Sequence, residues 1–210
     1  TPNSSEATNS PEHRQSSSPP YQPDCDHAGS CYPAGAMGDG VNDDTVAVQS
    51  ALNALRSGQT LRFPPGTFLV RNLTLPDVAS ISLAGAPGAP SASVLKLCNG
   101  SRYSHILASA NYVENSTFTG QPITVSSLTF AGPADGDLVG SSGFIMMQWS
   151  SRVARCTFKG FETGLRVSTV TAYGAPIVTS MVNNRYENNV FEPGRCSVYS
   201  ELLHQVLMRH

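Results

Sequence analysis

Short apolar runs separated by turn residues make up most of the chain after Cys31. Gly, Pro, Asn or Asp stands near the ends of each run. This pattern is typical of short β-strands bounded by turns. The predicted strand segments are LRFPPGTFLV, LTLPDVASISLAG, SVLKLCN, ITVSSLTFAG, SGFIMMQW, RVARCTFKGF, TGLRVSTVTA, IVTSMVNNRYENNVF and CSVY.

One segment follows the helical period instead. Apolar residues recur at helical spacing between Val48 and Leu55, acidic residues precede them, and Gly58 follows. Acidic side chains can accept hydrogen bonds from the first free amides of a helix, and glycine commonly ends one. The pattern predicts an α-helix over about 44–57.

Two strand segments align with each other without gaps. VSSLTFAG (125–132) and VARCTFKG (153–160) share Val, Thr, Phe and Gly, and a looser copy, ENNVFEPG (187–194), places Phe191 at the aromatic position. The two copies start 28 residues apart, at 125 and 153. A strand unit that recurs at such a spacing indicates coils stacked into a solenoid. Four asparagines near the last copy are expected at turns, because asparagine tolerates left-handed backbone: Asn183, Asn184, Asn188 and Asn189.

The two ends of the chain differ from this strand-rich middle. Residues 1–24 are rich in Ser, Pro and Asn, and they cannot bury enough apolar surface to offset chain entropy. We expect a flexible arm there and a single solenoid domain over 25–210, with coils over about 60–199. In SELLHQVLMRH, Ser200 can cap a short helix over 200–210 that shields the last coil, because solenoid ends need cover. Trimer packing through the same face is the alternative.

Charge and composition exclude some functions. Charged residues make up 13% of the chain, the net charge is -2 and the sequence pI is about 6.2, so no basic surface for nucleic acid or an anionic membrane is expected. No apolar run is long enough to span a bilayer as a helix. The chain starts at Thr1 without methionine, from which we expect a removed leader segment and a secreted protein.

Two cysteines bear on whether the protein is secreted. Cys25 and Cys31 flank a short polar loop and either close a small disulfide, as in an oxidising compartment, or remain free thiols. A zinc site using His27 would need two further ligands that the neighbouring sequence does not offer. We expect no metal and no cofactor.

The segment GAMGDGVNDDTVAVQSALNAL (35–55), followed by RFPPGTFLV (62–70), resembles the N-terminal signature of the pectate-lyase-like superfamily. This group includes polysaccharide lyases, glycoside hydrolases, epimerase-related proteins and phage tailspike depolymerases. The resemblance implies an all-β fold, a right-handed parallel β-helix solenoid with an N-terminal capping α-helix. It also implies that substrate lies along a sheet face or in a groove lined by loops between coils.

The aspartates of this segment are expected to be structural. A calcium loop of the EF-hand type that began at Asp39 would have Val41 and Ser50 at ligand positions, so that pattern fails. The resemblance implies instead that acidic and hydroxyl side chains satisfy helix amides while two glycines permit the turn. The residues concerned are Asp43, Asp44, Thr45, Gly38 and Gly40.

Two polar clusters are candidates for chemistry. In GPADGDLVGSSG (132–143), Asp135 and Asp137 offer the carboxylate pair that glycoside cleavage requires, or else form a solvated turn. In KGFETGLR, Glu162 with Arg166 or Lys159 offers a base beside a cation, which suits β-elimination from a uronic acid. A surface ion pair is the alternative for this second cluster.

Two further residues, Tyr103 and His105, could assist, although a lone histidine beside an isoleucine is more often a packing residue. The chain lacks the full Asn-Thr-Asp, Asp-Asp and His-Gly series of polygalacturonase-type hydrolases and the Asp-Pro-His motif of alginate epimerases.

The sequence therefore predicts an extracellular carbohydrate-active protein that cleaves an acidic or neutral polysaccharide by hydrolysis or β-elimination. A non-catalytic glycan-binding or structural module, such as an adhesin or tailspike-like segment, is the alternative. The expected partner is a polysaccharide or glycan, not nucleic acid or a membrane. The expected state is a monomer or a homotrimer.

Overall fold

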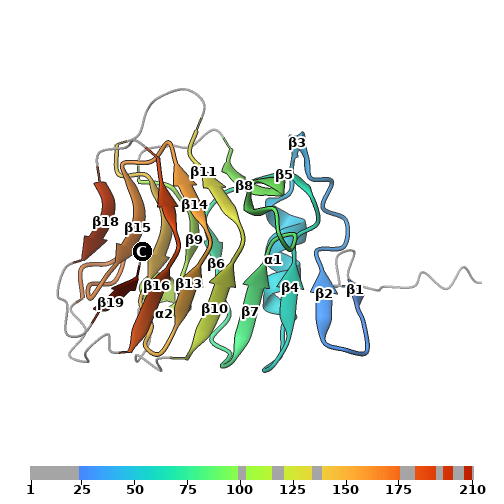
Figure 1. The fold of residues 1–210 in the computed structure, drawn as a ribbon, viewed down its shortest axis with the longest axis horizontal. Coiled ribbons are helices and arrows are strands. Elements are labelled where there is room, and N and C mark those ends of the chain that lie inside the picture. The colour runs from blue at the N-terminus through green and yellow to red at the C-terminus, as the bar shows by residue number, and fades with distance from the viewer. Residues whose placement is uncertain are drawn as a thin grey trace, which may run out of the picture.

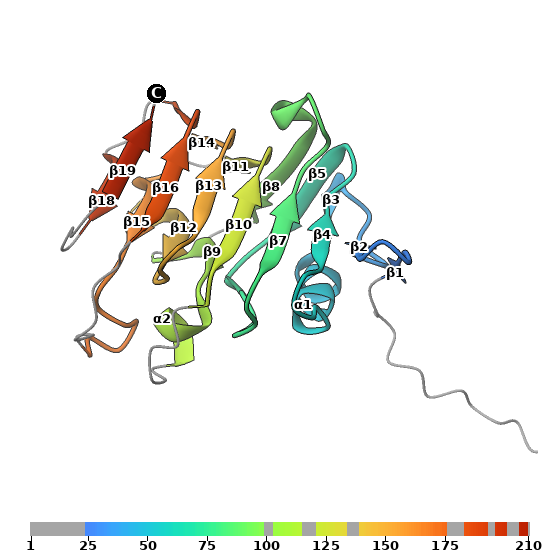
Figure 2. The same cartoon turned by 60° about the horizontal axis from the view of Figure 1, so that its bottom comes forward.

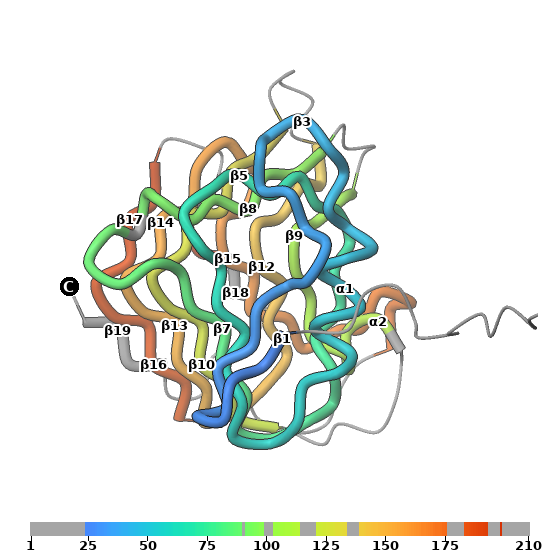
Figure 3. Tube along the Cα trace, turned by 90° about the vertical axis from the view of Figure 1, so that its right-hand side faces the viewer, coloured from blue at the N-terminus to red at the C-terminus, as the bar shows by residue number. Residues whose placement is uncertain are grey.

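The computed structural model describes residues 24–98, 103–114, 121–133, 139–175, 183–192, 196–200 and 206–209. Within them the chain runs repeatedly through three sheets, and each coil from β4 to β18 contributes one strand to each sheet (Figure 1, Figure 3). Every described strand pair is parallel except β1 (Asp24–Cys25) with β2 (Ser30–Tyr32), an antiparallel hairpin at the N-terminal end. The parallel sheets agree with the all-β, β-helix-type fold expected from the sequence.

Beyond that hairpin, neighbouring strands in each sheet come from successive coils. The eight-stranded sheet contains, in spatial order, β1, β2, β4 (Thr60–Arg62), β7 (Ile81–Ala84), β10 (Ile123–Ser126), β13 (Arg152–Ala154), β16 (Asn184–Glu187) and β19 (Val206–Arg209). The six-stranded sheet contains β17 (Val190–Phe191), β14 (Thr157–Lys159), β11 (Thr129–Ala131), β8 (Ser93–Leu97), β5 (Gly66–Val70) and β3 (Asp39–Asp43). The five-stranded sheet contains β18 (Cys196–Ser200), β15 (Thr163–Val167), β12 (Ser142–Met146), β9 (His105–Ala108) and β6 (Leu73–Thr74).

The sequence repeat is the stacking register of the coils. Val125 pairs with Val153 in the eight-stranded sheet, and Phe130 pairs with Phe158 in the six-stranded sheet. Phe158 pairs in turn with Phe191 of the looser copy. The repeat prediction is confirmed, because aligned residues stand directly above one another.

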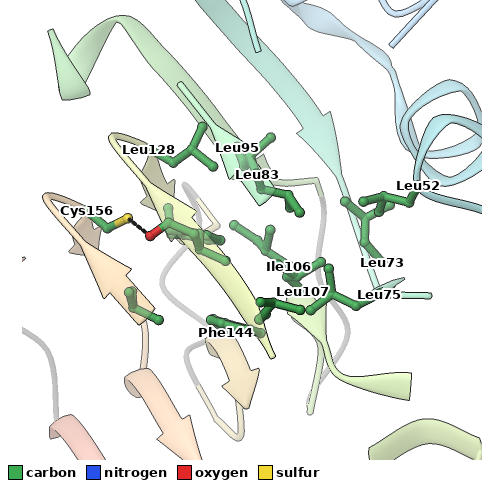
Figure 4. Packing of buried hydrophobic residues seen from close by; sticks show 14 of the residues in the cluster. Leu52, Leu73, Leu75, Leu83, Leu95, Ile106, Leu107, Leu128, Phe144 and Cys156 are labelled. Atoms are coloured by element: carbon green, nitrogen blue, oxygen red, sulfur yellow. Dashed lines mark hydrogen bonds between the residues drawn. The ribbon is translucent and has the colours of Figure 1, made fainter. Parts of the chain in front are cut away.

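A continuous apolar column fills the space between the sheets. Rings of Phe130 and Phe158 stack with centroids 4.8 Å apart, and those of Phe158 and Phe191 stack 5.1 Å apart. Aliphatic side chains from all three sheets belong to the same buried cluster, among them Leu83, Leu95 and Leu107 (Figure 4). Burial of this column supplies the main favourable term in folding.

Tight turns between sheets repeat from coil to coil. Ser127, Arg155 and Asn188 all have positive φ where the chain passes from the eight-stranded to the six-stranded sheet. One residue further on, the Asn189 side chain bonds back to the preceding coil, since its Oδ1 accepts from the Cys156 N–H at 2.9 Å. The turn positions expected for the asparagines are thus observed at Asn188 and Asn189. Asn183 also has positive φ, whereas Asn184 begins β16.

Helix α1 (Thr45–Asn53) is shorter than the predicted 44–57 and lies beside β6, the end strand of the five-stranded sheet. Figure 2 shows the helix at the same end of the stacked strands as β1 and β2. Its apolar face is buried in the core through Ala47, Val48, Ala51 and Leu52. On the same helix, the Gln49 side chain pairs with the main chain of Thr74 in β6, donating to its carbonyl and accepting from its N–H, both at 2.9 Å.

The aspartates before α1 bond to main-chain amides, with one difference from the expectation. Asp43 Oδ1 accepts from the Thr45 N–H at 2.9 Å, as expected for a helix start. The buried Asp44 carboxylate makes no bond to the helix and instead accepts from the N–H groups of Met37 and Gly38, at 2.6 and 3.1 Å. The preceding turn leaves these amides without strand partners. They therefore donate to the Asp44 carboxylate.

The helix expected over 200–210 is wrong for its described part, because Val206–Arg209 forms strand β19 in register with β16. Pairing with the open edge of the eight-stranded sheet outweighed the helical spacing of its apolar residues. The short helix α2 (Ala110–Glu114), the 3₁₀ turn Pro90–Ala92 and strand β9 had no counterpart in the predicted segments.

A disulfide joins Cys25 and Cys31 across the β1–β2 hairpin, which confirms one of the two alternatives. The arm expected over residues 1–24 lies, apart from Asp24, outside the described part of the chain. No described helix is long and apolar enough to cross a membrane.

Candidate functional site

The connections from the six-stranded to the five-stranded sheet form one edge of the solenoid. Tyr103 precedes β9, Gly140 and Ser141 precede β12, and Glu162 precedes β15, so the four residues come from three successive coils. We call them the Glu162 edge. Main-chain hydrogen bonds join the coils here, including Tyr103 N–H to the Val139 carbonyl at 3.0 Å.

Glu162 is held in this edge by two contacts with the preceding coil. Its carboxylate accepts a hydrogen bond from the Gly140 N–H, and its own N–H donates to Ser141 Oγ at 3.1 Å. The side chain remains half-buried, so part of it faces solvent. A carboxylate in this position is oriented by the backbone and accessible to a ligand.

Asp135 and Asp137 lie outside the described residues. Both belong to the connection between β11 and β12, and the described end of that connection, Gly140 and Ser141, is the part that contacts Glu162. The described end of the connection that carries the first predicted cluster thus contacts Glu162 of the second.

Arg166 is placed elsewhere. It lies near the other end of β15 from Glu162, about 13 Å along an extended strand. Its guanidinium carbon is 5.9 Å from the centroid of the Tyr112 ring of α2. The described contacts of Glu162 and Arg166 thus point to different neighbours, and their pairing as base and cation stays a prediction.

His105 belongs to the packing around Tyr112. The two rings meet edge to face with centroids 6.3 Å apart, and the histidine Nε2 is buried without a hydrogen-bond partner among the described residues. Burial lowers the pKa of His105 to about 4, so the imidazole is neutral at pH 7. A neutral, enclosed imidazole supplies no positive charge to a substrate.

Both lysines of the chain lie on the six-stranded sheet, in one row. Lys96 of β8 pairs with Ala131 of β11, which pairs with Lys159 of β14. Two strand spacings separate the lysine backbones, or about 10 Å. Lys159 is exposed and Lys96 is half-exposed, so this row presents positive charge on the outer surface.

Arginines gather on the outer face of the eight-stranded sheet. Arg152 forms an ion pair with Glu187 of the next strand, with 2.6 Å between Nη2 and Oε2, and its register neighbour Arg185 is exposed. Sequence reasoning missed this face. The signal was present, since aligning Phe158 with Phe191 places Arg152 beside Arg185.

Comparisons with known proteins agree with the fold. Residues 33–131 match the model of the family "Rhamnogalacturonase A/epimerase, pectate lyase-like". No curated protein sequence matches the chain significantly. The resemblance of this chain to the pectate-lyase-like superfamily, first drawn from residues 35–70, is confirmed.

Solved structures show the same type of coil. A Geobacillus virus E2 protein, ORF18, superposes with a TM-score of 0.52 at 18% identity, covering 82% of this chain and 40% of that one. The iota-carrageenase of family GH82 from A. fortis superposes with a TM-score of 0.50 at 13% identity, covering 79% of this chain and 37% of that one. The chain spans about two fifths of the length of these structures, and at such identities the likeness concerns the fold alone.

Proposed function

We propose that the protein acts outside the cell on a polysaccharide and cleaves it by hydrolysis or β-elimination at the Glu162 edge. The observation that carries the proposal is the Glu162 carboxylate, fixed by Gly140 and Ser141 beside the connection that contains Asp135 and Asp137. The family match over residues 33–131 and the likeness to a carrageenase support a carbohydrate substrate. The Cys25–Cys31 disulfide supports an oxidising, extracellular location.

We further propose that the fold is a right-handed β-helix in which α1 acts as the N-terminal cap. The pairing of the Gln49 side chain with Thr74 supports the cap, because it satisfies both main-chain groups of an edge residue that has no further strand beside it.

Each reaction assigns different roles to the carboxylates. In hydrolysis, one carboxylic acid protonates the departing glycosidic oxygen while a second carboxylate activates water or attacks the sugar, and Glu162 with Asp135 or Asp137 would share these roles. In β-elimination, Glu162 would take the proton next to a uronate carboxyl group, a carbon–carbon double bond would form as the glycosidic C–O bond breaks, and water or a second carboxylic acid would protonate the departing oxygen. A cation, Arg166 or Lys159, would neutralise the uronate carboxyl group.

Isosteric removal of the carboxylates tests the proposal. The wild-type protein is expected to release reducing ends, and with uronate substrates also unsaturated products that absorb ultraviolet light, from at least one member of a panel of acidic and neutral polysaccharides. Glu162→Gln should lower kcat/KM by about 100-fold or more, as for loss of a general acid or base. Asp135→Asn and Asp137→Asn should separate the carboxylate that acts with Glu162 from the one that does not.

Asp39→Asn is the matched control, because this exposed carboxylate bonds only within its own turn in the described structure. It should retain full turnover. Cleavage by the wild type that persists unchanged in Glu162→Gln would refute the role given to Glu162. No cleavage of any polysaccharide by the wild type would refute the enzyme.

A non-catalytic glycan-binding module is the second candidate. Its support is the regular outer surface of the solenoid, where Lys96 and Lys159 stand in one row and Arg152 and Arg185 stand side by side on another sheet. The exposed Lys159 and Arg185 offer positive charge to an anionic glycan. This function predicts glycan binding, without turnover, that survives the combined replacement of Asp135, Asp137 and Glu162 by alanine.

A further inference from the structure

An exposed aromatic ring lies on the Glu162 edge. The Tyr103 residue is 75% exposed and stands in the connection that leads into β9. Its N–H donates to the Val139 carbonyl at 3.0 Å, so the backbone that carries the ring is tied to the next coil. This ring adds nothing to the apolar column, and its exposure therefore calls for another explanation.

Tyr103 and Glu162 contact the same residue. A Cβ placed on Gly140 would lie 2.2 Å from Cδ1 of the Tyr103 ring, which shows that the ring lies directly against the Gly140 main chain. The N–H of Gly140 donates to the Glu162 carboxylate. Because the two side chains come from coils separated by one other coil, their backbones stand about 10 Å apart along the solenoid.

The backbone of Tyr103 is unusual for its residue type. Its φ is +66°, in the left-handed region that costs free energy for a bulky side chain. The other described non-glycine residues with positive φ are asparagine, serine or arginine. A conformation that disfavours tyrosine, at a position where the ring faces solvent, is unfavourable for folding and points to a role in binding.

We propose that Tyr103 is a binding platform on which one sugar ring of the polysaccharide stacks, in a subsite next to Glu162. A pyranose ring carries a face of C–H groups, and a tyrosine ring offers a flat apolar surface of matching size with a polar hydroxyl at its rim. Stacking there would bury both faces and hold the chain across Gly140, with a neighbouring glycosidic bond toward Glu162. The platform rests on the proposed polysaccharide substrate, and Tyr103 positions the sugar and takes no part in bond cleavage.

Three substitutions at Tyr103 and one control test the platform. Binding is measured by electrophoresis through native gels that contain polygalacturonate, alginate, iota-carrageenan or a neutral glucan, and turnover is measured on the same polymers. Tyr103→Ala should weaken binding roughly tenfold, whereas Tyr103→Phe, which keeps the ring, should bind within about twofold of the wild type. Tyr173→Ala is the matched control, because this tyrosine is 74% exposed but follows β15 at a different edge, and it should bind normally.

Tyr103→Asn separates binding from folding. Asparagine accepts the left-handed backbone, so this variant should melt no lower than the wild type and yet lose binding as Tyr103→Ala does. Normal binding by Tyr103→Asn or Tyr103→Ala, together with lost turnover in Glu162→Gln, would overturn the platform and leave the proposed function intact. A wild type that neither binds nor cleaves any of the polymers would overturn both.

Discussion

Burial of one histidine gives folding a dependence on pH. The pKa of His105 falls from its ordinary value of 6.5 to about 4 because burial disfavours the imidazolium. The unfolded chain therefore takes up a proton between these two values while the native protein does not. Stability contributed by the neutral histidine is complete above about pH 6.5 and is lost as the pH falls toward 4.

We expect the free energy of unfolding to decrease by about 3 kcal/mol from this group between pH 7.5 and pH 4. Urea denaturation of the wild type and of His105→Gln at a series of pH values measures the difference, because glutamine does not titrate. Parallel pH profiles for the two proteins would contradict this assignment.

Individual polar residues show where sequence reasoning reached its limit. Asp43 was assigned correctly to the first helix amide, because its distance along the chain from Thr45 fixes that contact. Asp44 was not, since its partners, Met37 and Gly38, are set by a turn whose path the sequence does not reveal. Local contacts follow from spacing, whereas contacts across a turn depend on the fold.

At the level of elements, Gln49 joins α1 to β6. Its side-chain amide makes two hydrogen bonds to the main chain of Thr74, on the side of β6 where no further strand is described. Gln49→Ala would leave these main-chain groups of β6 without partners and should lower the free energy of unfolding by about 1–3 kcal/mol. Val46→Ala on the same helix, where the side chain is exposed, should change it by less than about 0.5 kcal/mol. Chemical denaturation measures both, and equal effects would argue against the edge pairing.

Turn residues largely decide which strands the sequence predicts. Short apolar runs bounded by turn residues were found, as in the two copies of the repeat at 125–132 and 153–160, and so was β12, which is buried throughout. Strand β9 was missed because helix α2 begins two residues after it, with no Gly, Pro, Asn or Asp between the two elements. Strand β19 was predicted as a helix because its pairing depends on β16, a partner distant in sequence. Turn residues therefore reveal a strand from its sequence neighbours, and a strand without them gives no such signal.

At the scale of the whole molecule, the solenoid determines how much of the site was accessible to sequence reasoning. Because the coils stack in register, the contact between Glu162 and the connection before β12 can be predicted once both are assigned to the same edge. The choice of Arg166 as its partner rested on closeness in sequence. A strand separates residues four positions apart by about 13 Å, whereas neighbouring coils lie only about 5 Å apart. In this fold a register neighbour on the next coil is therefore closer than a residue four positions away on the same strand.

The same geometry predicts how a core substitution depends on its place in the column. Phe158 stacks between Phe130 and Phe191, whereas Phe191 is half-buried and has a described stacking partner, Phe158, on one side. Because each coil contacts its neighbours alone, the loss on removing a ring should scale with the neighbouring coils that it touches. Phe158→Ala should therefore cost about 3–5 kcal/mol, and Phe191→Ala roughly half as much.

Lys159→Ala, an exposed change on the same strand as Phe158, should leave stability within about 0.5 kcal/mol of the wild type. Urea titrations followed by circular dichroism give the three free energies of unfolding. A cost for Phe191→Ala as large as that for Phe158→Ala would mean that the column continues to be packed on the far side of Phe191, so that stability at this end depends on contacts beyond β17. A smaller cost would place Phe191 at a true boundary of the core, where substitution removes one stacked partner and little buried area.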